Sequence, residues 1–167
     1  MRPSTRRTRC ALGVPLSAAL LVLTACGAGT VTVEGAAQLE DLGAAEEACT
    51  GLLDALPDEL GGQETRDVEP AGVAAQAWGD PVVVLVCGAE MPLAFGPTSP
   101  CDVVEEVQWY VDERSALDPA ADVVLTTIGY EPVVQVRIPA RLRPPADEMV
   151  ALAPAIRENA ELVESCT

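Results

Sequence analysis

The chain of 167 residues contains no histidine and no lysine, and aromatic residues make up only 3% of it. Without histidine, the Ser-His-Asp and Cys-His nucleophiles, imidazole acid–base chemistry and His-ligated metal sites are excluded. Ser99, Ser115 and the Thr126-Thr127 pair therefore have no His or Lys that could act as their base. The formal net charge of −16 argues against nucleic-acid binding, because that binding needs Lys and Arg to neutralise phosphates.

The N-terminal segment has the organisation of a secretory signal. Residues 1–9 carry arginines and no acid, and an apolar run follows from Ala11 to Leu23. This run is too short to span a bilayer, which needs about 20 apolar residues. It ends in Leu23-Thr24-Ala25-Cys26, which resembles the lipobox of bacterial lipoproteins, where the cysteine receives a diacylglyceryl group and the chain is cut before it. We therefore predict a signal peptide over residues 1–25 and lipidation of Cys26, with a twin-arginine export signal at Arg6-Arg7 as the alternative.

This signal predicts a protein held on the extracytoplasmic face of the cell membrane by its lipid. Two acyl chains suffice for stable anchoring, because each buried CH₂ contributes about 0.8 kcal/mol. Cleavage before Cys26 removes four of the ten basic residues and no acid, which leaves six against 26, a net charge of −20. Such a charge keeps a domain soluble and repels it from anionic lipid. We expect residues 26–35 to form a flexible tether and residues 36–167 a single domain.

Four cysteines remain in the predicted domain, and an even number in an exported protein favours two disulfides. They are Cys49, Cys87, Cys101 and Cys166, and the sequence alone allows three pairings. Cys49 and Cys166 are in phase with the apolar stripes of two predicted helices, so we favour a Cys49–Cys166 bond between the two ends of the domain. The remaining bond, Cys87–Cys101, would close a loop rich in Pro and Gly. The absence of C-x-x-C and of His disfavours a redox centre or a zinc site, and no cofactor or metal is expected.

Two helices are predicted from apolar residues spaced three or four apart. The first runs from Leu39 to Leu56, where Pro57 stops it, and the second from Met149 to Cys166. Pro154 falls within the second pattern, where it should kink the helix or begin a new segment with its ring towards solvent.

Four strands are predicted between the helices, and residues 61–77 read as a polar loop. The strand candidates are Val82–Cys87, Val103–Val111, Val123–Ile128 and Val133–Ile138, the last two joined by a hairpin-like connection over residues 129–132. Strands flanked by helices predict an α+β fold. We expect a four-stranded antiparallel sheet with the N- and C-terminal helices packed on one face.

Several short motifs accompany the four cysteines. They include Trp78-Gly79-x-Pro81, an apolar strand ending in Cys87-Gly88, Trp109, Thr126-Thr127-x-Gly129 and a valine-rich strand ending in Pro139. Together with the lipobox, they make the chain resemble an actinobacterial secreted or lipoprotein family known as domain of unknown function 3515. The resemblance covers about residues 44–166. It implies no activity, so no catalytic residue can be carried over from it.

Trp78 and Tyr130 are the candidates for a binding surface. Trp78 lies in a turn, where an exposed ring can grip a sugar or a peptide, but a Trp in a small domain more often fills the core, and this is the favoured position for Trp78 and Trp109 alike. Paired acids occur at 40–41, 46–47, 58–59, 105–106 and 147–148, mostly on polar helix faces where they are solvated. Glu105 differs, since it falls on the inward face of its predicted strand, where a buried carboxylate needs a partner such as Arg114 or Arg137.

Three functions are compatible with these features. The first is a non-enzymatic, membrane-anchored module that binds an envelope protein or polymer. The second is a carboxylate-based enzyme acting on envelope polysaccharide, which needs two acids in one cleft. The third is a structural spacer, which would have no concave pocket. The sequence leaves the ligand and the oligomeric state open.

Overall fold

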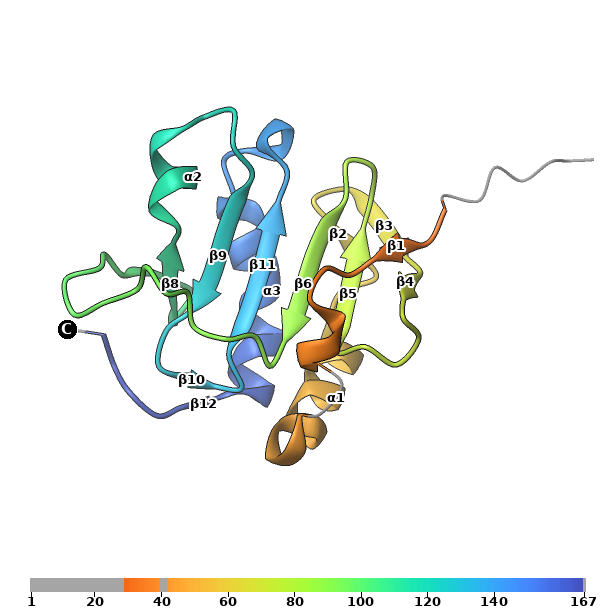
Figure 1. Cartoon of the computed structure of the whole chain (residues 1–167), viewed down its shortest axis with the longest axis horizontal. Coiled ribbons are helices and arrows are strands. Elements are labelled where there is room, and N and C mark those ends of the chain that lie inside the picture. The colour runs from red at the N-terminus through yellow and green to blue at the C-terminus, as the bar shows by residue number, and fades with distance from the viewer. Residues whose placement is uncertain (1–28, 40–41, 167) are drawn as a thin grey trace, which may run out of the picture.

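The computed structural model describes residues 29–39 and 42–166, and its main feature is an eight-stranded sheet (Figure 1). The strand order is β2-β3-β5-β6-β11-β9-β8-β7, and every neighbouring pair is antiparallel. The strands are β2 (Glu59–Leu60), β3 (Gln63–Arg66), β5 (Ala75–Trp78), β6 (Val83–Cys87), β7 (Asp102–Val104), β8 (Val107–Val111), β9 (Val123–Thr127) and β11 (Val134–Ile138). The fold thus combines helices with an antiparallel sheet, as expected, but the sheet has eight strands where four were predicted.

Two of the helices pack against each other and share the main core with the central strands. The helices are α1 (Glu46–Ala55), α2 (Glu113–Leu117) and α3 (Ala146–Asn159), with 3-10 turns η1 (Ala36–Leu39), η2 (Gly43–Ala45) and η3 (Ala140–Leu142). Cys49 and Leu52 of α1 and Leu152 and Ile156 of α3 meet alternate residues of the strands, such as Leu85. Burial of one such leucine contributes about 1.5–3 kcal/mol. Pro154 lies inside α3 with its ring exposed, as predicted.

A second, smaller core lies on the other side of β5 and β6. There β1 (Val31–Thr32) pairs in parallel with β4 (Val68–Glu69), and the segment from β1 to η1 buries Val33 and Leu39. These side chains pack with Ala75 and Val86, which point away from the main core because strand side chains alternate. The predicted flexible tether over residues 26–35 is therefore part of the fold from Val31 onward.

The region predicted as a polar loop, residues 61–77, instead forms β3, β4 and most of β5. Its polar side chains are compatible with strands because this end of the sheet is half-exposed, with Glu64 and Thr65 open to solvent. Trp78, at the end of β5, is fully buried. Apolar periodicity gave no strand signal here because none of the β3 and β4 side chains is fully buried.

The predicted strand Val103–Val111 is a hairpin made of β7 and β8. Glu105 and Glu106 form its turn, with φ angles of 48° and 67°. This turn explains why Glu105 broke the inward alternation: its side chain is exposed in the turn and has no need of Arg114 or Arg137 as a partner. Arg157 of α3 instead donates to the carbonyl oxygen of Glu105 (3.1 Å) and to the Glu106 carboxylate (2.7 Å).

The predicted C-terminal helix ends at Asn159, before the last apolar positions of its pattern. The chain then becomes extended in β12 (Glu161–Leu162), which pairs with β10 (Tyr130–Glu131). The amides of Val163 and Glu164 donate to the carbonyl of Gly129, at 2.7 and 3.2 Å. Gly129 has a φ of 72°, and a Cβ there would overlap the Glu164 carbonyl, so glycine allows this close approach.

Four cysteines form two disulfides, but the predicted pairing is wrong. The bonds are Cys49–Cys87 and Cys101–Cys166. Cys49 on α1 meets the inward-facing last residue of β6, and both are buried in the main core. Cys166 lies beyond the end of α3, and its amide donates to Gln108 (2.6 Å), which brings it to the β7–β8 side of the sheet next to Cys101.

Candidate functional site

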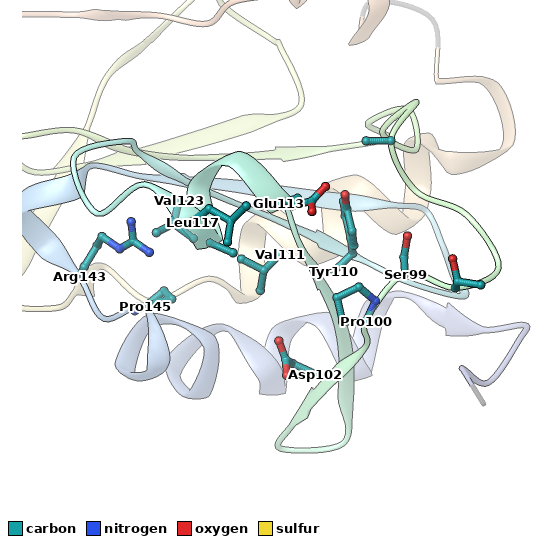
Figure 2. A pocket seen from close by; sticks show the side chains of 13 residues that line it. Ser99, Pro100, Asp102, Tyr110, Val111, Glu113, Leu117, Val123, Arg143 and Pro145 are labelled. Carbon is teal, nitrogen blue, oxygen red and sulfur yellow. The ribbon is translucent and has the colours of Figure 1, made fainter.

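A cavity of about 640 Å³ lies beside β8, between α2 and the loop that precedes β7 (Figure 2). Its apolar wall comes from β8, α2, the start of β9 and the approach to α3, and its polar groups come mainly from the loop, β7 and α2. The lining residues are Ala94, Thr98, Ser99, Pro100, Asp102, Tyr110, Val111, Glu113, Ala116, Leu117, Val123, Arg143 and Pro145. Of the residues considered from sequence, only Ser99 lines it.

The cavity reaches the edge of the sheet. Tyr110 and Val111 are neighbours in β8, and their side chains must point to opposite faces. Because both line the cavity, the cavity extends around the edge of the strand between them. β7 covers this edge only as far as the pair Asp102–Trp109. Beyond that pair the chain has left the ladder at Pro100, which has no N–H to donate.

The hydrogen-bond phase of β8 shows which main-chain groups face the cavity. Towards β9, Ile128 donates to the carbonyl of Gln108, and Asp112 donates to the carbonyl of Val124. In an antiparallel ladder these contacts fall on every second residue, so the N–H and C=O of Val111 point to the opposite edge. No residue in the described ranges pairs with Val111 on that edge.

Tyr110 supplies a hydroxyl to the cavity. The residue is only 3% exposed, and Phe95 packs edge-on against its ring with the centroids 5.4 Å apart. Within the described part of the chain, the Tyr110 hydroxyl makes no hydrogen bond, and because it is not among the buried unpaired polar atoms, it is open to solvent in the cavity. Figure 2 shows this hydroxyl and the Glu113 carboxylate at the same end of the cavity.

The short helix α2 is positioned by its N-cap. The Asp112 carboxylate accepts from the amides of Arg114 (3.0 Å) and Ser115 (3.4 Å), and the Ser115 hydroxyl donates to the Asp112 carbonyl (2.7 Å). This cap turns the chain directly after β8 and places Glu113 and Leu117 on the cavity. Leu117 remains 76% exposed, which leaves an uncovered apolar rim.

Arg143 lines the cavity and also holds a neighbouring loop in place. Its guanidinium donates to the carbonyls of Asp118 (2.9 Å) and Ala121 (3.4 Å), and so holds the loop between α2 and β9. The two carboxylates of Asp102 and Glu113 outnumber this one cation among the lining residues, so a ligand would meet a net negative charge.

The two side chains predicted for a binding surface are buried. Trp78 is 0% exposed, and its indole N–H donates to the carbonyl of Pro57 (2.9 Å). Tyr130 is 4% exposed, and its hydroxyl donates to the carbonyl of Glu106 (2.9 Å). Burial raises the pKa of this phenol above its ordinary value. Both residues therefore fill the core, as does Trp109.

Other sequence candidates have structural roles. Ser115 takes part in the α2 cap, and Thr127 accepts from the Val134 amide (2.9 Å) between β9 and β11. The buried acid is Glu148, not Glu105: Glu148 is 6% exposed, and one of its carboxylate oxygens has no partner in the described structure. Burial raises the pKa of Glu148. Within residues 29–39 and 42–166, no group of three or more Cys, Asp and Glu side chains could hold a metal ion.

Cys26, the predicted lipidation site, lies outside the described residues. Among the residues that are described, no helix is long and apolar enough to cross a membrane. A comparison with known sequence families matches residues 10–164 to the family described as "Protein of unknown function (DUF3515)".

The chain belongs to the DUF3515 family. This confirms the resemblance drawn from the cysteines and the Trp-Gly-x-Pro motif, and the match spans the cavity and Cys26 alike. No curated protein and no solved structure matches the chain.

Sequence reasoning missed the cavity of this DUF3515 chain because its residues come from six separate segments. Tyr110 lies in the middle of a predicted strand, and nothing in the sequence distinguishes Asp102 and Glu113 from the other acidic residues. One local signal was available: Asp112 with Ser115 three residues later has the spacing of a helix N-cap, and would have predicted α2 directly after β8.

Proposed function

We propose that this DUF3515 protein is a lipid-anchored, extracytoplasmic binding module without catalytic activity, and that the cavity beside β8 is its ligand site. The observation that carries the proposal is the preformed cavity, which combines an apolar wall with a solvent-accessible hydroxyl at Tyr110 and an exposed rim at Leu117. Few convergent polar groups in a concave apolar site are typical of ligand binding. A structural spacer has no need of such a site.

The lipobox at residues 23–26 supports the anchoring part of this proposal. Val31, the start of β1, lies only five positions after Cys26. Five extended residues reach about 17 Å at most, so a lipid on Cys26 would hold the folded domain close to the membrane surface. The net charge of −20 would then oppose further contact with anionic headgroups.

The anchoring part is tested with Cys26→Ala, which removes the thioether position. We expect the wild-type protein in the membrane fraction and the variant in the soluble exported fraction or retained with its leader, with intact mass reporting the diacylglyceryl group. An unmodified wild-type chain would refute the anchor.

The binding part is tested by photocrosslinking in intact cells. A benzoylphenylalanine in place of Leu117 sits on the cavity rim, and the same residue in place of Val150, which is 47% exposed on α3, is the matched control. We expect a discrete adduct from position 117 only. Equal adducts at both positions, or none at 117, would contradict a ligand site in the cavity.

A second candidate function rests on the two carboxylates, Asp102 and Glu113, that line the same cavity. A glycoside hydrolase needs two acids flanking its substrate. Incubation of the protein with isolated envelope polysaccharide tests this alternative. Release of reducing ends that disappears in both Asp102→Asn and Glu113→Gln would favour the enzyme over the binding module.

A further inference from the structure

The edge of β8 at Val111 is the feature of the cavity that most restricts what can bind there. Val111 lines the cavity, and its N–H and C=O, which face away from β9, meet no partner in the described structure. An uncovered strand edge is a template for pairing with another extended chain. A sugar polymer lacks the alternating amide donors and carbonyl acceptors that such an edge selects.

The side chains around Val111 add a charge preference. Asp102 faces the same side of the sheet as its partner Trp109, whereas Glu113 lies with the Tyr110 hydroxyl at one end of the cavity (Figure 2). Because side chains alternate along a strand, an added strand would direct successive side chains towards these two regions. Both carry a carboxylate, and among the described lining residues they face one cation, Arg143, so the cavity lining keeps a net negative charge.

We propose that the cavity binds an extended peptide segment with a basic side chain, which adds to the free edge of β8 at Val111 and places its charge beside Asp102 or Glu113. The Tyr110 hydroxyl can hydrogen-bond to the same peptide, and Leu117 packs on an apolar side chain of the peptide next to the basic one. This inference rests on the binding part of the proposed function and is independent of the lipid anchor.

The probes are three five-residue peptides, N-acetylated and C-amidated, with alternating Thr and Val around a central Arg, Gln or Glu. Each is titrated into the ¹⁵N-labelled full-length protein in detergent micelles, with the amide signals of Tyr110 and Asp112, which every variant retains, as readout. We expect the Arg peptide to bind most tightly and the Glu peptide least, with the difference shrinking as salt rises. Replacing Asp102 by Asn and Glu113 by Gln together should abolish this preference.

The decisive pair of variants is Val111→Pro and Val111→Ala. Proline removes the N–H that faces away from β9 and no bond to β9, and a strand tolerates proline where its N–H has no ladder partner. Alanine keeps the N–H and loses a similar part of the side chain. We expect Val111→Pro to weaken all three peptides by about fivefold or more and Val111→Ala by less than about twofold. Circular dichroism and thermal melting verify that both fold.

Three results would overturn the inference. The first is equal binding by the Pro and Ala variants, and the second is no binding of any peptide up to about 5 mM. The third is self-association of the protein that Val111→Pro abolishes, which would show a second copy of the chain on this edge. If the peptides fail while the residue-117 crosslink forms, the proposed function stands and only the peptide assignment is lost.

Discussion

Removing each disulfide separately tests how the two ends of the domain are held. The variants are Cys49→Ala with Cys87→Ala, and Cys101→Ala with Cys166→Ala. The bonds close loops with sequence separations of 38 and 65 residues. In the chain-entropy treatment each contributes about 4 kcal/mol, with only about 0.5 kcal/mol in favour of the longer loop.

Packing reverses this small difference. Cys49 and Cys87 are 1% and 0% exposed, whereas Cys101 and Cys166 are half-buried. Truncating the buried pair also leaves a void in the core, at about 1 kcal/mol per deleted sulfur. We therefore expect the Cys49/Cys87 variant to lose more stability, although its bond closes the shorter loop.

Urea unfolding of both variants and the wild type gives the free energies. Mild dithiothreitol treatment of the folded wild type, followed by alkylation and mass spectrometry, gives the order of reduction, and Cys101–Cys166 should open first because it is the more accessible. Peptide mapping without reduction reports the pairing directly. A Cys49–Cys166 peptide, or a larger loss from the Cys101/Cys166 variant, would refute this reasoning.

Two further predictions concern acids that the fold places in unusual surroundings. Burial raises the pKa of Glu148, so its contribution to stability is fully present below the ordinary carboxyl pKa and is lost as pH rises through the raised, folded-state pKa. Urea unfolding should therefore show Glu148→Gln gaining stability on wild type as pH rises above the ordinary carboxyl range, and a pH-independent difference would contradict this. Glu105 has a φ of 48°, so Glu105→Gly should stabilise the protein by about 0.5–1 kcal/mol, as measured by thermal melting. Glu106→Gly, the control, should gain less because it also loses the ion pair to Arg157, and a melting-temperature drop for Glu105→Gly would argue against strain in this turn.

Local sequence patterns predicted those helices and strands whose buried side chains recur at a regular spacing. The stripe through Cys49 and Leu52 indicated a buried helix face, and α1 has it. The valine-rich runs indicated β6, β9 and β11, the three central strands, where one face packs against the helices. Such strands and helices can be recognised because each core side chain recurs at the period of its own element.

Elements whose side chains depend on distant partners were mispredicted. Glu105 broke the strand pattern because it lies in a hairpin turn, which the flanking valines concealed. Trp78 is buried because it pairs with Val83 and donates to Pro57, and neither contact is visible in its own turn sequence. The helical pattern through Cys166 failed because β10 pairs with the extended C-terminal segment.

The sequence by itself determined the charge, the exclusion of histidine and lysine chemistry, the cysteine count and the family, since each is a property of residues taken in order. Only the tertiary structure decided which cysteines meet and where a ligand could bind. The cavity exists because β7 ends opposite Trp109 while β8 continues to Val111. Each of these two strands ends where other contacts turn its backbone out of the sheet. The contacts are the disulfide at Cys101, next to β7, and the helix cap at Asp112, directly after β8. They belong to separate segments of the sequence and come to the same edge of the sheet only in the folded protein.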